Sequence, residues 1–261
     1  MEVVIVGDRS EGGQIAGSAI CSLFNLQPFS VLGLATGSSP EPVYDDLAAR
    51  YARCEVSFRR GRGFLLDEYV GLPSHHPESY RTVIERQVVD RLDFESSSVK
   101  GPNGTAADLA AACASYEEAI AEAGGVSIQL LGIGSDGHIG FNEPGSSLAS
   151  RTRIKTLTAD TRRDNSRFFG GNPSAVPPHV ITQGIGTILQ ARHLILLAWG
   201  TNKAAALASA IEGPVTASVP ASALQLHPHA TVIADHEAAS HLARRAYYLE
   251  TWNAKPAWQS I

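Results

Sequence analysis

The sequence predicts an α/β protein with a mostly parallel central sheet. Short apolar runs of strand length recur along the chain, segments with helical spacing separate them, and glycine or polar turns follow them. Strands that alternate with helices in this way pair in parallel, with helices on both faces of the sheet. A length of 261 residues suits one large domain, and no repeat or linker divides the chain. We therefore expect one domain over 1–261, with a loosely held tail at 252–261.

Each predicted strand is a short, mainly apolar segment. Six of them lie at 2–6, 31–35, 63–66, 126–131, 193–198 and 231–234. Helices are expected at 8–24, from 43 onward, and at 79–92, 106–123, 160–169, 179–190, 200–211 and 236–251. Two other segments are expected to differ, because 95–104 is polar and irregular and 147–158 has the character of a β-ribbon or extended arm.

Composition limits the kinds of partner. Apolar residues make up 44% of the chain, which is enough for a sizeable core, and the net charge of −5 argues against nucleic acid or an anionic membrane. No apolar stretch reaches the length of a membrane span, and no signal peptide is evident. The cysteines, Cys21, Cys54 and Cys113, are widely spaced and suit buried thiols in a reducing compartment. We expect a cytoplasmic protein that acts on a small molecule.

The segment 130–144 carries the strongest functional signal. An apolar strand there runs into a glycine-rich turn that contains Asp136, His138 and Glu143. In open parallel sheets, ligands bind where loops leave the carboxyl ends of the strands. Two acids and a base so close together are suited to moving protons on a small polar substrate.

The same segment is open to two other interpretations. Its three glycines match G-x-G-x-x-G, which in dinucleotide sites opens a helix and precedes an acidic residue by about 20 positions. Pro144 interrupts any helix here and the following residues are basic, so neither nicotinamide nor flavin is expected. In the other interpretation, Asp136 and His138 only cap a glycine turn, and the local pattern leaves this open.

Small polar residues follow the second predicted strand and precede a helix. They are Thr36, Gly37, Ser38 and Ser39. Backbone N–H groups at such a turn can cradle an anion, and an ordinary N-cap by serine explains the pattern equally well. Lys203 stands at another strand-to-helix turn in a chain with few lysines. Arg167 belongs to a basic region that is either a phosphate pocket or a solvated charged face.

An acidic pair, Asp67 and Glu68, follows the third predicted strand. If the strands are parallel, the pair lies at the same sheet edge as Asp136 and one member is a candidate base; otherwise both are solvated end charges. His227 and His229 are spaced for a metal ion. However, a proline separates them and no acidic partner is near, so no metal site is expected.

Several longer blocks resemble the glucosamine-6-phosphate deaminases, also called glucosamine-6-phosphate isomerases. The matching blocks are 32–40, 66–73, 76–80, 134–144 (Gly-Ser-Asp-Gly-His-Ile-Gly-Phe-Asn-Glu-Pro), 146–157, 165–169 and 224–228. The resemblance runs from about residue 30 to 235. It implies a modified Rossmann-like, three-layer α/β/α fold of the phosphogluconolactonase and ribose-phosphate-isomerase type. The lactonases are the nearest alternative, but they lack the Phe-Asn-Glu-Pro continuation and the block Asp-Glu-Tyr-Val-Gly-Leu at 67–72.

The resemblance implies conversion of glucosamine 6-phosphate and water to fructose 6-phosphate and ammonia. His138 would shuttle a proton during ring opening, with Asp136 and Glu143 orienting its imidazole. Asp67 would move a proton from C2 to C1, and we expect a desolvated pocket that raises its pKa. The substrate supplies its own carbonyl, so no pyridoxal, metal or nicotinamide cofactor is needed. Because all four positions are intact, a non-catalytic sugar-phosphate sensor is disfavoured.

The resemblance also implies the binding contacts. The 6-phosphate would lie on the turn 36–39 between Lys203 and Arg167, and Glu68 would be a structural partner. Family members often form hexamers, and smaller assemblies occur, so a homo-oligomer is expected.

Regulation is left open by the resemblance. Regulated family members bind N-acetylglucosamine 6-phosphate at a second site. The matching positions here are Ser146, Arg153, Lys155 and Thr156. A tyrosine that those members use near the C-terminus has no secure match, because Tyr247 and Tyr248 are in uncertain register.

Overall fold

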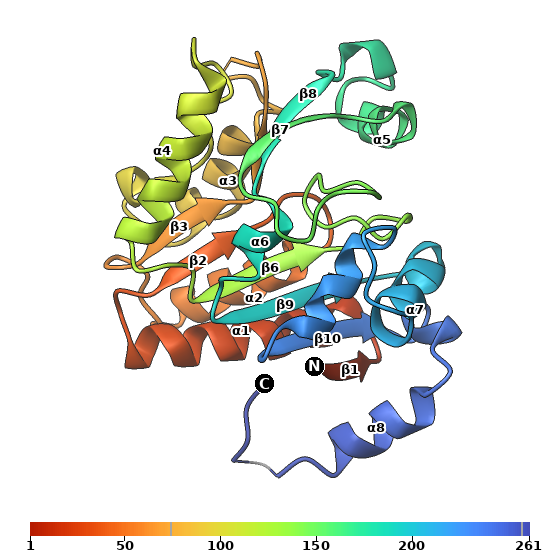
Figure 1. Cartoon of the computed structure of the whole chain (residues 1–261). Helices are drawn as coiled ribbons and strands as arrows, with labels where there is room; N and C mark the ends of the chain where they lie inside the picture. The colour runs from red at the N-terminus through yellow and green to blue at the C-terminus, as the bar shows by residue number, and fades with distance from the viewer. Residues whose placement is uncertain (74, 257) are drawn as a thin grey trace.

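The centre of the molecule is a parallel β-sheet (Figure 1). The computed structural model describes residues 1–73, 75–256 and 258–261, and seven strands of this part of the chain form the sheet. They are β1 (Glu2–Val6), β2 (Val31–Leu34), β3 (Arg62–Leu65), β5 (Val99–Lys100), β6 (Ile128–Gly132), β9 (His193–Ala198) and β10 (Ala230–Asp235). Their order is β1-β10-β9-β6-β2-β3-β5, and every neighbouring pair is parallel. Because helices cover both faces, the central strands are buried along most of their length instead of alternating between buried and exposed residues.

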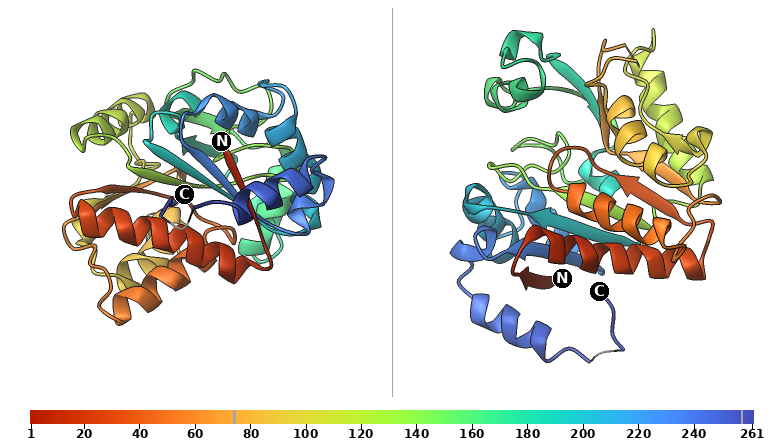
Figure 2. Two further views of the ribbon diagram at one scale, coloured as in Figure 1. Left: turned by 90° about the horizontal axis from the view of Figure 1, so that it is seen from below. Right: turned by 180° about the vertical axis from the view of Figure 1, so that it is seen from behind.

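Helices pack on both faces of this sheet. The α-helices are α1 (Arg9–Leu26), α2 (Glu41–Ala52), α3 (Tyr80–Gln87), α4 (Leu109–Glu122), α5 (Ala159–Asn165), α6 (Ile185–Ile188), α7 (Ala204–Glu212) and α8 (Arg245–Asn253). Helices α1 and α2 lie side by side on one face, and α6 lies on the other (Figures 1 and 2). Asp8, Ser79, Asp108 and Thr158 each cap a helix by accepting a hydrogen bond from the backbone N–H three residues further on.

A smaller antiparallel sheet stands beside the central one and carries α5 at its far end (Figure 1). Its strands are β4 (Asp67–Tyr69), β7 (Arg153–Thr156) and β8 (His179–Thr182), in the order β4-β8-β7. One residue, Leu66, separates β3 from β4, so the chain passes directly from one sheet into the other. This junction holds Asp67 at the edge where the parallel strands end.

The six predicted strands are all present, and three other expectations about secondary structure were wrong. The segment 95–104 is not irregular throughout, because it contains β5, while Asp67 and Glu68 after the third predicted strand begin a further strand, β4. The expected helix 179–190 starts as strand β8, because β-branched residues favour pairing with a partner strand that the sequence alone does not reveal. The expected helix 236–251 is split into the 3₁₀-helix Ala238–His241 and α8, since the Glu212 carboxylate accepts hydrogen bonds from the N–H groups of Ala243 and Arg244.

Two apolar cores stabilise the two sheets. The main core joins the central strands to the covering helices, and a smaller cluster lies under the second sheet. The smaller cluster consists of Tyr69, Phe141, Leu157, Val176 and Val180. Within the described ranges, no helix combines the length and apolar character needed to cross a membrane.

The C-terminal tail was expected to be loosely held, and residue 257 lies outside the described residues. Lys255 Nζ lies 2.5 Å from Glu2 Oε1, while Trp252 and Ile261 pack against the main core. The loose tail and the single domain stay predictions.

Candidate active site

A cavity of about 740 Å³ opens at the carboxyl ends of the parallel strands. The residues that follow four strands line it: Ala35 after β2, Leu66 after β3, Ile133 after β6 and Trp199 after β9. This is the edge at which ligands bind in open α/β sheets. Its volume falls within the range of small-molecule sites.

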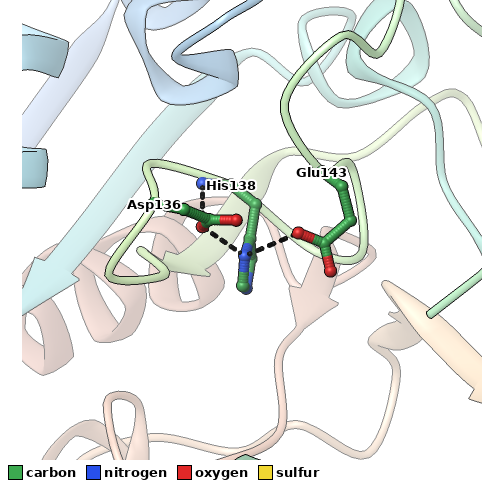
Figure 3. Close-up of side chains that lie close together, drawn as sticks. All are labelled: Asp136, His138 and Glu143. Atoms are coloured by element: carbon green, nitrogen blue, oxygen red, sulfur yellow. Dashed lines mark hydrogen bonds and ion pairs between the residues drawn. The ribbon is translucent and has the colours of Figure 1, made fainter. Parts of the chain in front are cut away.

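Asp136, His138 and Glu143 come together at this edge, as the sequence predicted. His138 Nδ1 lies 2.7 Å from Asp136 Oδ1 and 3.5 Å from Glu143 Oε2. Figure 3 shows the imidazole between the two carboxylates. The backbone N–H of His138 also donates to Asp136 Oδ1 at 3.1 Å. Capping of the turn therefore occurs together with the side-chain contact and is not an alternative to it.

The two carboxylates control the charge of the imidazole. Burial alone would lower the pKa of His138, but its contacts with Asp136 and Glu143 outweigh burial and raise the pKa to about 9. Burial alone would also raise the pKa of Asp136, but its hydrogen bond and charge interaction with His138 hold it below its usual range. At neutral pH the pair is therefore an imidazolium and a carboxylate.

The glycines of this loop allow a close contact at one position and a turn at another. A β-carbon at Gly134 would lie 2.3 Å from the His138 ring, and Gly137 has a φ of +87°. In the described part of the chain, the next helix after β6 is α5, so these glycines open no helix. A dinucleotide site of this type would need such a helix, and the absence of a dinucleotide cofactor stays a prediction.

Asp67, the first residue of β4, lies at the same cavity. Its side chain is buried and lines the cavity, as His138 does. Burial and then the negative charge of Glu68 raise the pKa of Asp67 to about 8, while the charge of His138 opposes them. The expected desolvation of Asp67 is confirmed.

Glu68 points its carboxylate at the start of α3. Its oxygens accept hydrogen bonds from the N–H groups of Tyr69, Tyr80 and Arg81 at 2.8, 3.0 and 2.9 Å. Burial raises the pKa of Glu68, and these three hydrogen bonds oppose that rise. The contacts support a structural role for Glu68.

The turn 36–39, which precedes helix α2, also lines the cavity. Gly37 has a φ of +86°, which favours glycine. Among the described residues, no protein acceptor takes the backbone N–H groups of Gly37, Ser38 or Ser39. These N–H groups remain available for an anion, as the cradle interpretation requires.

Two residues that the sequence analysis missed hold this turn. Arg9 Nη2 donates to the Ser38 carbonyl at 3.2 Å, and Trp199 Nε1 donates to the Ser39 carbonyl at 2.9 Å. Both side chains line the cavity. Their signal was weak, because a charged residue at a helix start and an aromatic residue at a strand end have many other uses.

Lys203 and Arg167 lie close enough to influence each other. Burial lowers the pKa of Lys203, and the nearby charge of Arg167 lowers it further. Both residues line the cavity. Asp235 accepts hydrogen bonds from Gly200 N–H at 3.1 and 3.0 Å and so holds the turn that leads to Lys203. Two neighbouring cations at one end of a cavity suit a phosphate group.

The four positions matched to an effector site lie elsewhere. None of them lines the cavity. Arg153 and Lys155 point to one side of β7, while Thr156 points to the other and its Oγ1 lies 3.2 Å from His179 Nδ1. Ser146 is buried. Effector binding at these residues stays a prediction.

Two groups of residues that contain histidine are relevant to metal binding. In the described chain, Asp136, His138 and Glu143 form the one group whose potential ligand atoms lie within 4.8 Å of one another, but these atoms already contact each other. The nitrogens of His227 lie 2.8 Å from the backbone carbonyl oxygens of His229 and Ala191. Both nitrogens of this imidazole therefore have backbone partners. The absence of a metal cofactor stays a prediction.

Comparison with known proteins identifies the family. The model of the family described as glucosamine-6-phosphate isomerases/6-phosphogluconolactonase matches residues 20–233. The chain belongs to this family.

Individual relatives are similar over the whole chain. Glucosamine-6-phosphate deaminases of Beutenbergia cavernae and Mycolicibacterium smegmatis are each 59% identical, with 100% of both chains covered. A solved structure described as a monomeric glucosamine-6-phosphate deaminase is 41% identical, with a TM-score of 0.90 over 92% of this chain and 100% of that chain. The 6-phosphogluconolactonase from Trypanosoma cruzi is 23% identical, with a TM-score of 0.74 over 93% of this chain and 97% of that one, and shares the fold. The predicted Rossmann-like α/β class is confirmed.

Proposed function

We propose that this chain is a glucosamine-6-phosphate deaminase, which converts glucosamine 6-phosphate and water to fructose 6-phosphate and ammonia. The observation that carries the proposal is a single cavity lined by Asp67, His138 and Lys203. A base, a proton shuttle and a phosphate-binding end are the three parts that this reaction needs. The high identity to deaminases over the whole chain supports the same reaction.

The phosphate end sets the orientation of the substrate. The free N–H groups of the turn 36–39 and the cations Lys203 and Arg167 hold the 6-phosphate. The substrate then extends across the cavity toward the ends of β3 and β6, with C1 and C2 near Asp67 and His138. Binding energy from the phosphate, which does not react, is used to place the carbons that do.

Ring opening comes first. The pyranose must lose the proton of its anomeric hydroxyl while its ring oxygen gains one. The His138 imidazolium donates its proton to the ring oxygen and takes up the anomeric proton in return, and Asp136 and Glu143 keep the imidazole in place and stabilise its cation.

Isomerisation and loss of ammonia follow. In the open sugar, the aldehyde at C1 acidifies the hydrogen at C2. Asp67 removes that hydrogen as a proton to give an enolamine and returns the proton to C1, which leaves an iminium at C2. Water adds to this iminium, and expulsion of ammonia gives the ketone of fructose 6-phosphate. A carboxylate with a pKa raised to about 8 is a stronger base than an ordinary one, yet it is still ionised in part near neutral pH. No step in this sequence calls for a cofactor.

One assay separates this proposal from lactone hydrolysis, the other activity in the family description. The wild-type protein should form ammonia and fructose 6-phosphate from glucosamine 6-phosphate, and it should not hydrolyse 6-phosphogluconolactone above background. Asp67→Asn should lose at least about 100-fold in kcat, because the base is gone. The thermal midpoint of this isosteric variant should stay at or above that of wild type, since a buried carboxyl has been made neutral. Full deamination by Asp67→Asn would refute the assignment of the base.

Three further properties belong to the proposal. We expect a cytoplasmic location and a homo-oligomer, although the 41% identical deaminase structure is described as monomeric. Light scattering on purified protein will measure the oligomeric state. Addition of N-acetylglucosamine 6-phosphate to the assay tests for activation; a hyperbolic rate curve that the effector leaves unchanged would exclude it.

A further inference from the structure

The Glu143 carboxylate depends on one side chain for a hydrogen bond. Thr161 Oγ1 donates to Glu143 Oε1 at 2.5 Å, and both side chains are buried. The other oxygen, Oε2, faces His138 Nδ1 at the longer distance of 3.5 Å. Within the described ranges, no other residue donates a hydrogen bond to this carboxylate.

The Thr161 hydroxyl is itself held in one direction. Thr158, the N-cap of α5, donates from Oγ1 to Thr161 Oγ1 at 3.0 Å and accepts from the Thr161 N–H at 3.1 Å. Since the Thr161 hydroxyl accepts from Thr158, its own hydrogen is free to point at Glu143. The two threonines at the start of α5 therefore leave one hydroxyl, that of Thr161, with its hydrogen directed at Glu143.

The same short segment connects to other parts of the cavity. Asn165, at the end of α5, donates from Nδ2 to the hydroxyl of Tyr69 at 3.0 Å, and Arg167 follows two residues later. Thr161 and Arg167 both line the cavity. The segment that supplies a cation for the phosphate therefore also holds a carboxylate that faces the imidazole.

We infer that Thr161 is a positioning residue for ring opening, which acts on His138 through Glu143. Without the hydroxyl, Glu143 Oε1 would be buried with no hydrogen-bond donor. The carboxylate would then rotate away from the imidazole toward another donor. His138 would then be held by Asp136 alone. The inference rests on the proposed role of Glu143.

The expected effect is on turnover more than on binding. Among the described residues, the hydrogen bonds of Thr161 go to Thr158 and Glu143 and not to the turn 36–39 or Lys203, so the phosphate end should be unaffected. Thr161→Val keeps the shape of the side chain and removes the donor. Its kcat should fall about 10-fold or more, in line with the loss of one hydrogen bond to a buried charged group. The KM for glucosamine 6-phosphate should change much less.

A matched control exists elsewhere in the chain. Thr187 is buried in α6 and donates from Oγ1 to Glu117 Oε1 at 2.6 Å, but neither residue lines the cavity. Thr187→Val therefore removes a threonine-to-glutamate hydrogen bond far from the chemistry, at a partly buried glutamate that still accepts from the Thr152 N–H and from Arg151. It should lower the thermal midpoint no more than Thr161→Val does and leave kcat near the wild-type value.

The test measures kcat, KM and thermal midpoint for Thr161→Val, Thr161→Ser, Thr187→Val and Glu143→Gln. The inference predicts a low kcat in Thr161→Val and its recovery in Thr161→Ser, which restores the hydroxyl. If Glu143→Gln keeps full activity, the proposed role of Glu143 fails. If Glu143→Gln is impaired while Thr161→Val turns over as fast as Thr187→Val, the inference about Thr161 fails and the proposed function stands. Should Thr161→Val not fold, Thr161→Ala replaces it, with Thr187→Ala as its control.

Discussion

Asp67 faces Thr182 across the antiparallel strands β4 and β8, and the Thr182 hydroxyl accepts a hydrogen bond from the N–H of Phe141 at 3.1 Å. Gly140 approaches the same pair, because a β-carbon there would lie 3.0 Å from Thr182 Oγ1 and 3.5 Å from Asp67 Oδ2. The loop that carries His138 is thus fastened against the strand that carries Asp67. The proposed base, Asp67, and the proposed proton shuttle, His138, therefore have a fixed position relative to each other, although they come from different parts of the fold.

The rate should depend on pH through Asp67. Burial and the charge of Glu68 raise its pKa to about 8, and only the ionised carboxylate can remove a proton. We expect kcat/KM to rise with pH up to about 8, after allowance for the separately titrated amine and phosphate of the substrate. Initial rates in overlapping buffers will measure this. An acid limb centred near the ordinary carboxyl value of about 4 would contradict the desolvated site.

Folding stability should also depend on pH, through His138. Its pKa rises from 6.5 to about 9 on folding, so the folded state binds the proton more tightly. The stabilisation is complete below pH 6.5 and is lost as the pH rises through 9. It amounts to at most about 3 kcal/mol. Thermal or urea unfolding at several pH values checks this, and His138→Gln should decline less steeply over the same interval. If stability falls with pH equally in the wild type and in His138→Gln, the imidazole is not charged in the folded state.

Gly134→Ala should impair catalysis by displacing the imidazole. The added β-carbon would lie 2.3 Å from the His138 ring, so the ring must move away from Asp136. We expect kcat to fall about 10-fold or more, because a proton shuttle works only at hydrogen-bond distance. Gly101→Ala is the comparison, since Gly101 lies outside the cavity, its φ is not in the left-handed region, and the nearest atom to its β-carbon would be Leu65 Cδ2 at 3.3 Å. A fully active Gly134→Ala would show that the ring tolerates displacement.

Lys203→Met should weaken phosphate binding. Loss of a cation beside Arg167 should raise the KM for glucosamine 6-phosphate about 10-fold or more, with a smaller effect on kcat. Inorganic phosphate should also become a poorer competitive inhibitor. Lys100→Met, at an exposed position in β5 outside the cavity, serves as the control. Equal KM values for the two variants would place the phosphate elsewhere.

Trp199→Phe tests the support of the turn 36–39. The indole packs against α1, where a β-carbon at Gly12 would lie 2.5 Å from its Cη2 atom, and its Nε1 donates to the Ser39 carbonyl. Phenylalanine keeps part of this packing and loses the donor. We expect KM to rise about 3-fold to 10-fold, the effect of one neutral hydrogen bond. Trp252→Phe, in α8 away from the cavity, should leave KM unchanged. If both variants bind substrate alike, the Trp199 hydrogen bond does not shape the turn.

Much of the site was predictable because its residues follow apolar strands. The runs that end near Ala35, Leu66 and Ile133 predicted buried strands, and parallel pairing then brought Asp67 and His138 to one edge. This prediction needed only local periodicity and a general rule of α/β folds.

The contacts that depend on distant pairing were not predictable. Strand β8 was expected to be a helix, because nothing within 179–182 shows that β4 and β7 lie on either side of it. Thr161 and Trp199 were missed for the same reason. Their hydrogen-bond partners, Glu143 and Ser39, lie far away in sequence, and a threonine or tryptophan alone carries no sign of such a partner.

The pairing of β1 with β10 has a consequence for biosynthesis. Glu2–Val6 leaves the ribosome long before Ala230–Asp235, the strand that pairs with it among the described residues. While the residues between the two strands are translated, the nascent chain therefore carries a β-segment without its partner strand. Helix α1 can shield this segment only in part, so a truncated polypeptide that stops before β10 should be prone to self-association and to capture by chaperones.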